Sequence, residues 1–232
     1  MIQNRRFSLV FRICALLIGI IGVMSQIGIF KGKISFSSFM YYTIQSNLLV
    51  IVLFIMLTIK TVISLRNGTM GSSGWFTRFE MVCVVNIFVT FIVFWTLLAG
   101  SLSKEYLLSF ENQAVHTITP LLCLADYILF TEARRLKYSD VYLTCIYPLF
   151  YVVFVTIAGF SGYVYYYTTS GPFSSKMEPV RFPYFFLDYD RIGKSALLYI
   201  AGISLFVIAL GHGMYLIDRK IRKSKAKTDI AS

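Results

Sequence analysis

The sequence predicts an all-α membrane protein, a polytopic bundle of six transmembrane helices that forms a single domain over residues 1–232. Hydrophobic residues make up 57% of the chain and charged residues only 14%, which is more apolar material than one soluble core needs. The mean hydropathy of +0.70 indicates the same class. The apolar runs are too long and too continuous for the alternating strands of an outer-membrane barrel.

Six apolar runs are about as long as the roughly 20 residues that a helix needs to cross the hydrocarbon core. They cover residues 9–29, 38–60, 79–100, 114–131, 141–164 and 195–217. The first run follows a basic segment, as in a signal peptide, but no small-residue cleavage site follows it. We therefore interpret it as the first transmembrane helix.

The longest connection, residues 165–194, joins the last two predicted helices on the outer side. It contains several prolines and many aromatic residues, so its composition differs from that of a flexible linker. Connections of this length are often lids or binding segments. We expect this one to pack back over the end of the bundle.

The distribution of Lys and Arg predicts how the bundle is oriented, because cytoplasmic loops retain positive charge. With six spans, both termini lie on the same side, and that side carries 15 of the 22 basic residues. The opposite side carries seven: Lys31, Lys33, Lys104, Lys176, Arg181, Arg191 and Lys194. We expect a multi-pass cell-membrane protein with both termini in the cytoplasm.

The net charge of +11 is attributed to these loops, and we predict no binding of nucleic acid. The basic C-terminal tail is interpreted as an anchor of the topology, with a patch for anionic lipids as the alternative. The four cysteines lie in apolar runs without the paired spacing of a metal or redox site. We predict no metal and no cofactor.

A polar cluster lies near the start of the second predicted helix, where Thr43, Ser46 and Asn47 interrupt an apolar run. Their spacing of three and four residues puts these side chains on one face and directs Gln45 elsewhere. The second and fourth helices both enter from the outer side, so His116 lies at about the depth of Thr43. Ionisable residues inside a membrane are costly and are candidates for function.

Pro120 follows His116 by four residues and lacks the N–H that would bond the His116 carbonyl. We expect the helix to bend at this point and to open a pocket beside the imidazole.

A threonine hydroxyl beside an imidazole can carry out acyl transfer, because His116 can take the proton of Thr43 and return it to a leaving group. Asn47 can donate its amide N–H to the developing oxyanion, and Ser46 is a further polar residue of this site. The alternative is that the polar cluster only bonds between helices, as Ser, Thr and Asn commonly do in membranes. Both interpretations fit the spacing.

No acidic residue is assigned as the orienting partner of the histidine, although Glu111, Asp188 and Asp190 belong to the outer side. Asp188, Thr119 and Trp95 are candidates for the lining of a substrate pocket. For Trp95 we favour packing inside the bundle.

Asp126 lies about three turns deeper than His116, in the inner half of the fourth helix. We expect it to pair with Arg134, Arg135 or a residue of a neighbouring helix.

Three segments of the chain together resemble a known family. They are a Y/F-T-x-x-S-N stretch opening the second helix, a histidine opening the fourth, and the P-Y-x-F-L-D segment at residues 183–188. The chain resembles the androgen-induced and androgen-dependent membrane hydrolases, and more closely their bacterial relatives, the Pr-six-Pr membrane proteins. The resemblance covers most of the chain.

This resemblance implies a threonine hydrolase that splits fatty acid esters of hydroxy fatty acids within the membrane, with Thr43 and His116 as the catalytic residues. A transfer of the acyl group to an acceptor other than water is a variant of the same chemistry. The expected partner is a membrane lipid or another acyl ester, and the site lies in the outer half of the bilayer. The alternatives are a small-molecule transporter or channel and a lipid-binding protein without catalysis.

Overall fold

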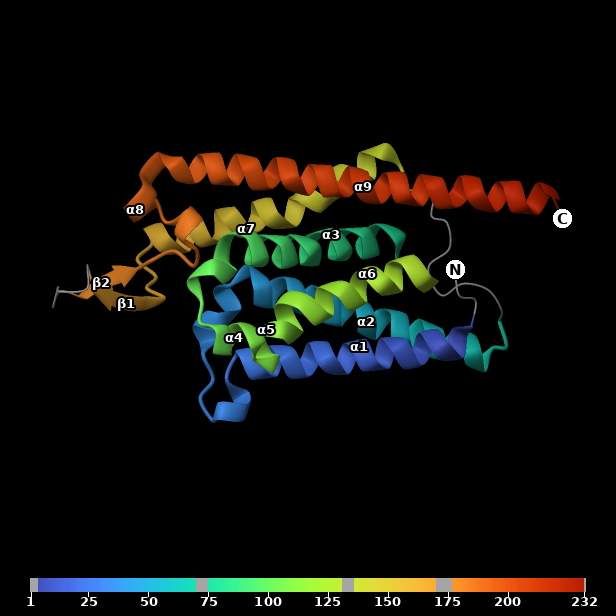
Figure 1. Cartoon of the computed structure of the whole chain (residues 1–232), viewed down its shortest axis with the longest axis horizontal. Helices are drawn as coiled ribbons and strands as arrows, with labels where there is room; N and C mark the ends of the chain where they lie inside the picture. The colour runs from blue at the N-terminus through green and yellow to red at the C-terminus, as the bar shows by residue number, and fades with distance from the viewer. Residues whose placement is uncertain (1–3, 70–74, 131–135, 170–176, 232) are drawn as a thin grey trace.

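Six long helices lie side by side along one axis, which confirms the predicted all-α bundle (Figure 1). The computed structural model describes residues 4–69, 75–130, 136–169 and 177–231. In this part of the chain six helices are long and apolar enough to cross a membrane. They cover Arg5–Gln26, Tyr42–Arg66, Arg78–Ser101, Phe110–Phe130, Tyr138–Phe160 and Tyr189–Lys220.

Several of these spans combine an α-helix with a short segment of different pitch. The α-helices are α1 (Arg5–Gln26), α2 (Tyr42–Arg66), α3 (Thr77–Val93), α4 (Lys104–Leu108), α5 (Phe110–Gln113), α6 (Thr119–Phe130), α7 (Leu143–Phe160), α8 (Tyr189–Ile192) and α9 (Ala196–Ala231). Two π-helical turns, η3 (Phe94–Leu98) and η5 (Ala114–Ile118), continue α3 and connect α5 to α6. The 3₁₀ segments are η1 (Ile29–Lys31), η2 (Phe36–Met40), η4 (Ala99–Ser101), η6 (Tyr138–Tyr142), η7 (Phe185–Leu187) and η8 (Gly193–Ser195).

Local sequence explains both ends of α1. The Asn4 side chain caps its first turn by accepting the N–H of Phe7 at 3.1 Å. The helix ends just before Gly28, which has a φ of +87°. A Cβ at Gly28 would lie 2.3 Å from the carbonyl oxygen of Lys33, so the turn requires glycine.

The bundle is built around α3. It contacts α2, α6, α7 and α9, and half of the most apolar stretch of its span is buried, as in the Phe110–Phe130 span, compared with 17% in the last span. Large apolar side chains point outward from α7 at helical spacing, at Ile146, Phe150, Val153 and Ile157. Such an outward apolar stripe suits contact with lipid, because hydrocarbon chains solvate it as well as a protein core does.

The first and last helices share one end of the bundle, and the long connection lies at the opposite end. In Figure 1, α1 begins and α9 ends at one end, and the connection between α7 and α9 lies at the other. The cytoplasmic location of both termini stays a prediction. The helix α9 continues to Ala231, well beyond the predicted end at residue 217, because a polar segment of good helix formers extends the apolar run.

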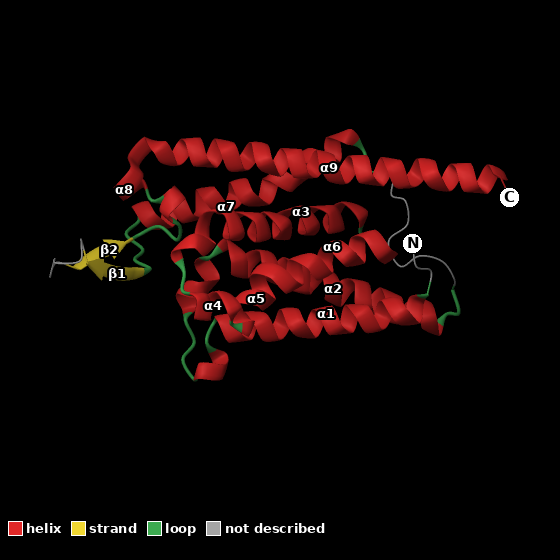
Figure 2. Cartoon of the chain, viewed as in Figure 1, coloured by secondary structure: helices red, strands yellow, loops and turns green. Residues whose placement is uncertain are grey.

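The long connection has two parts that the sequence did not distinguish. Its first part is a short antiparallel hairpin, β1 (Tyr166–Thr169) and β2 (Met177–Val180), which projects from the end of the bundle (Figure 2). Its second part packs back onto the helices, as predicted, and buries Phe182, Phe186 and Leu187. Phe182 comes close to α7 because Gly159 has no side chain; a Cβ there would lie 2.4 Å from the Phe182 ring.

Candidate active site

Thr43 and His116 lie next to each other at the hairpin end of the bundle. Thr43 belongs to the first turn of α2 and His116 to the π-helical turn η5. The Thr43 Oγ1 lies 3.3 Å from the His116 Nε2. Their side chains are 9% and 5% exposed. The structure therefore brings together the two residues that the sequence predicted to lie at the same depth.

The hydrogen-bond partner of the second imidazole nitrogen, Nδ1, defines the tautomer of His116. His116 Nδ1 lies 3.1 Å from the backbone carbonyl oxygen of Asn112, which can only accept a hydrogen bond. The neutral imidazole therefore carries its proton on Nδ1 and has a free lone pair on Nε2. This tautomer allows Nε2 to accept the Thr43 proton. The orienting group is a carbonyl, so no carboxylate fills this role; Glu111 instead pairs with Lys31 at 2.9 Å.

The bend expected near Pro120 takes the form of the π turn. In η5 the N–H of Thr119 bonds to the carbonyl of Ala114, five residues earlier. With the same five-residue spacing, the Val115 carbonyl would accept the N–H of residue 120, but Pro120 has no N–H. The Asn47 side chain fills this gap by donating to the Val115 carbonyl at 3.0 Å.

Asn47 also donates to the carbonyl of Thr43, at 2.8 Å. Its amide N–H groups are thus directed to two backbone carbonyls, and the residue is fully buried. In this geometry Asn47 links α2 to the turn that carries His116. It does not face the cavity where an oxyanion would form.

Ser46 joins α2 to α3. Its hydroxyl donates to the Thr43 carbonyl at 3.1 Å and lies 2.8 Å from the Thr90 Oγ1. Because Ser46 is 1% exposed, its contribution is to hold the first turn of α2 in place. Gln45 is directed away from this cluster, as predicted, and bonds to the Phe39 carbonyl and to Tyr147.

Phe94 covers the imidazole and was not foreseen from the sequence. Its ring stacks on His116 with centroids 3.8 Å apart and an interplanar angle of 21°. Phe94 opens the π-helical turn η3, so two π turns face each other at this point. The stacked ring excludes water from one face of the base. An aromatic residue among many others in an apolar helix gives no signal that could have marked it.

A cavity of about 650 Å³, part of it open to the surface, lies beside Thr43. Its walls are mostly apolar and come from α2, α3, η3, α7, α9 and the connection before α8. They include Thr43, Thr90, Phe94, Tyr184, Ile200 and Ser204. His116 is not in the wall, because Phe94 lies over it. The pocket expected beside the imidazole is therefore a pocket beside the threonine.

The three further pocket candidates lie outside this wall. Trp95 is 39% exposed, so it does not pack inside the bundle as we favoured, and its indole N–H donates to Thr117. Thr119 is buried on the side of α1, near Gly19. Asp188 caps α8 by accepting the N–H groups of Asp190 and Arg191.

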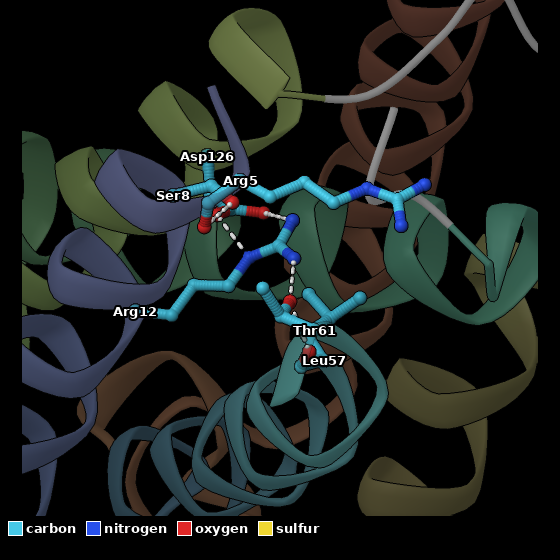
Figure 3. Close-up of polar contacts among 6 residues, drawn as sticks. All are labelled: Arg5, Ser8, Arg12, Leu57, Thr61 and Asp126. Atoms are coloured by element: carbon cyan, nitrogen blue, oxygen red, sulfur yellow. Dashed lines mark hydrogen bonds and ion pairs between the residues drawn. The ribbon is translucent and has the colours of Figure 1, made fainter. Parts of the chain in front are cut away.

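Asp126 takes part in a second polar cluster, deeper in the bundle (Figure 3). Arg12 of α1 donates to its two carboxylate oxygens at 2.7 and 3.0 Å, and to the Thr61 hydroxyl at 2.8 Å. The partner is thus on a neighbouring helix, one of the predicted alternatives. Arg134 and Arg135 lie outside the described residues.

Comparisons of the chain with protein-family models, with curated proteins and with solved structures found no match.

Proposed function

We propose that this protein is an intramembrane threonine-dependent hydrolase of lipid esters. The observation that carries the proposal is the 3.3 Å contact between Thr43 Oγ1 and His116 Nε2, at the wall of an apolar cavity, with Nδ1 of the same ring on the Asn112 carbonyl. Acyl transfer needs a nucleophile, a base held in the correct orientation and adjoining space for a substrate. The site has all three.

In the proposed reaction, Thr43 Oγ1 attacks the ester carbonyl while its proton moves to His116 Nε2. The bond to the leaving alcohol then breaks, and His116 returns the proton to the alkoxide. Water attacks the resulting acyl-threonine by the reverse sequence and releases the acid. If another alcohol replaces water, the same steps transfer the acyl group instead.

The lining of the cavity supports a long-chain substrate. Apolar residues of α3, α7 and α9 dominate the wall, and an acyl chain would lie among them. The resemblance noted in the sequence favours fatty acid esters of hydroxy fatty acids. Thr43 lies in the first turn of its helix, near the end of the bundle, where water can reach an acyl-enzyme.

The experiment is labelling of the purified chain in detergent micelles with a fluorophosphonate, together with hydrolysis of a fatty acid ester of a hydroxy fatty acid. We expect labelling and hydrolysis to be lost in Thr43→Ala and in His116→Ala. The matched control is Thr58→Ala, on the same helix about 22 Å from Thr43 by helical rise. It should keep both activities.

Labelling that persists in both Thr43→Ala and His116→Ala would exclude this site. A wild-type protein that binds the ester and never cleaves it would instead be a lipid-binding protein. Mass spectrometry of the labelled peptide separates these cases, because the proposal requires the phosphonate on Thr43.

A further inference from the structure

The proposed reaction needs a donor for the oxyanion, and Asn47 is not available for this role. Both of its donor contacts go to backbone carbonyls within the helix bundle. An oxyanion forms on the cavity side of Thr43, so the donor must come from the residues that share that wall. These residues include members of the connection between β2 and α8 and of the first turn of α2.

Tyr184 is the residue of that connection that brings a hydroxyl to the cavity. It lines the same wall as Thr43. Aromatic rings hold it on several sides: Phe186 stacks on it at 5.0 Å and 4°, and Tyr41 meets it edge-on at 5.8 Å and 84°. The Tyr151 ring lies 6.4 Å away. A side chain packed in this way has a fixed position before substrate arrives.

The anchoring of the connection adds to this rigidity. Phe182, two residues before Tyr184, is 2% exposed and lies against Gly159 of α7. Phe186 and Leu187, which follow it, are 4% and 3% exposed. Tyr184 is thus held between buried residues on both sides in sequence.

The phenol group points to the first turn of α2. Its ring meets that of the N-cap residue Tyr41, and Tyr184 lines the same cavity wall as Tyr42 and Thr43. The N-cap residue Tyr41 makes no side-chain cap, and the first N–H groups of a helix have no partner within the helix. The positive end of the helix dipole lies at the same point, which favours a developing negative charge.

We propose that Tyr184 is a catalytic residue that donates the hydrogen bond stabilising the oxyanion formed when Thr43 attacks an ester, together with the first-turn N–H groups of α2. The inference rests on the proposed function. As the Oγ1–carbon bond forms, the electron pair of the carbonyl moves to its oxygen, which accepts the Tyr184 hydrogen bond. The pair returns when the bond to the leaving alcohol breaks, so the phenol keeps its proton throughout.

The protonation state of the phenol fits this role. Burial raises the pKa of Tyr184 above its ordinary value, and this outweighs the opposing effect of its contacts with Thr43 and Tyr151. The hydroxyl therefore remains a donor at neutral and mildly alkaline pH.

The test is the pair Tyr184→Phe and Tyr189→Phe in the full chain. Tyr189 belongs to the same outer region, but its ring packs on Phe160 and Phe182 away from the cavity wall. We expect Tyr184→Phe to lower kcat by about 10²-fold or more with KM changed less than about 3-fold, the pattern of a lost oxyanion donor. Tyr189→Phe should stay within about 2-fold of wild type.

A second readout separates catalysis from folding. A long-chain trifluoromethyl ketone forms an oxyanion on Thr43, whereas the corresponding ether does not. We expect Tyr184→Phe to weaken binding of the ketone by at least about 10-fold relative to binding of the ether. Because both affinities are measured on the folded protein, their ratio does not depend on how much of the variant folds.

The oxyanion role of Tyr184 and the hydrolase activity can fail separately. If wild type cleaves the ester and Tyr184→Phe keeps both kcat and the ketone-to-ether ratio, Tyr184 is not the donor and the hydrolase assignment stands. If wild type neither labels nor cleaves, both fail. A fall in kcat with an unchanged ratio overturns the oxyanion role, because the effect is then structural.

Discussion

The two polar clusters inside this bundle differ in how their groups are bonded and in what lies beside them. At the deeper cluster, Arg12 is 0% exposed and donates at least three hydrogen bonds of 2.7–3.0 Å (Figure 3). At the outer cluster, Thr43 and His116 share one contact of 3.3 Å beside a cavity of about 650 Å³. The gap next to Asp126 has no room for a water molecule.

This difference corresponds to two uses of a polar group in an apolar environment. A charged pair stays buried only when its partners compensate for the lost solvation, and removing one partner is then costly. A reactive pair must keep a lone pair and a proton available to substrate, so its bonding is incomplete. Substitutions at the deeper cluster should therefore reduce stability, and substitutions at the outer cluster should reduce activity.

The largest effect is expected from Thr43→Val, which replaces the hydroxyl by a methyl group of the same shape. Ester hydrolysis should fall by at least about 10⁴-fold, as for the loss of a nucleophile. The midpoint of thermal unfolding in detergent should change little, because the contact of the hydroxyl with His116 is long, at 3.3 Å, and contributes little to stability. Hydrolysis assays and thermal scans of the same preparation check this. If Thr43→Val strongly destabilised the protein but kept its activity per folded molecule, the outer cluster would serve stability and not catalysis.

Arg12→Met tests the deeper cluster by leaving Asp126 without its cation. The free energy of unfolding should fall by about 3–5 kcal/mol, the usual cost of breaking a buried ion pair. In the double variant Arg12→Met/Asp126→Leu most of this loss should be recovered, since Asp126 is no longer a buried carboxylate without its cation. Unfolding curves of the two variants measure the difference. Activity per folded molecule should stay near wild type, and a selective loss of activity would mean that the clusters are coupled.

Gly22→Ala addresses the packing that positions the histidine. A Cβ at Gly22 would lie 2.6 Å from the Cβ of Ala114, the first residue of the π turn that carries His116. The resulting displacement should lower kcat by roughly 10-fold and destabilise the fold by about 1–3 kcal/mol. Gly19→Ala on the same helix is the control, because its Cβ would meet Ile51 at an acceptable 3.4 Å. Equal effects of the two substitutions would contradict a specific contact with η5.

The smallest effect is expected from Trp95→Phe. The indole donates to Thr117 on the exposed side of the bundle and is not part of the cavity wall. Activity and stability should remain within about 2-fold and about 0.5 kcal/mol of wild type. A clear loss of hydrolysis in a folded Trp95→Phe protein would show that the substrate extends beyond the cavity beside Thr43.

Part of this arrangement followed from the sequence because depth and face in a membrane helix are simple functions of residue number. Thr43 and His116 could be paired from residue numbers alone, since both helices enter from one side and both residues lie near the start. The role of Asn47 could not be foreseen. It depends on the π turn at residues 114–118, which leaves the Val115 carbonyl opposite a proline, and on the proximity of α2 to that turn.

Composition and hydrophobic run length by themselves determined that this chain is a bundle of six membrane helices, because a hydrocarbon core admits only helices or closed barrels. The positions of the polar residues along those helices determined which of them lie at the same depth. Only the tertiary structure decided that Phe94 covers the imidazole, that Arg12 neutralises Asp126 and that Tyr184 shares a cavity wall with Thr43. These contacts join segments far apart in the chain, and their geometry is set by side-chain packing between helices, which sequence spacing within a single helix does not encode.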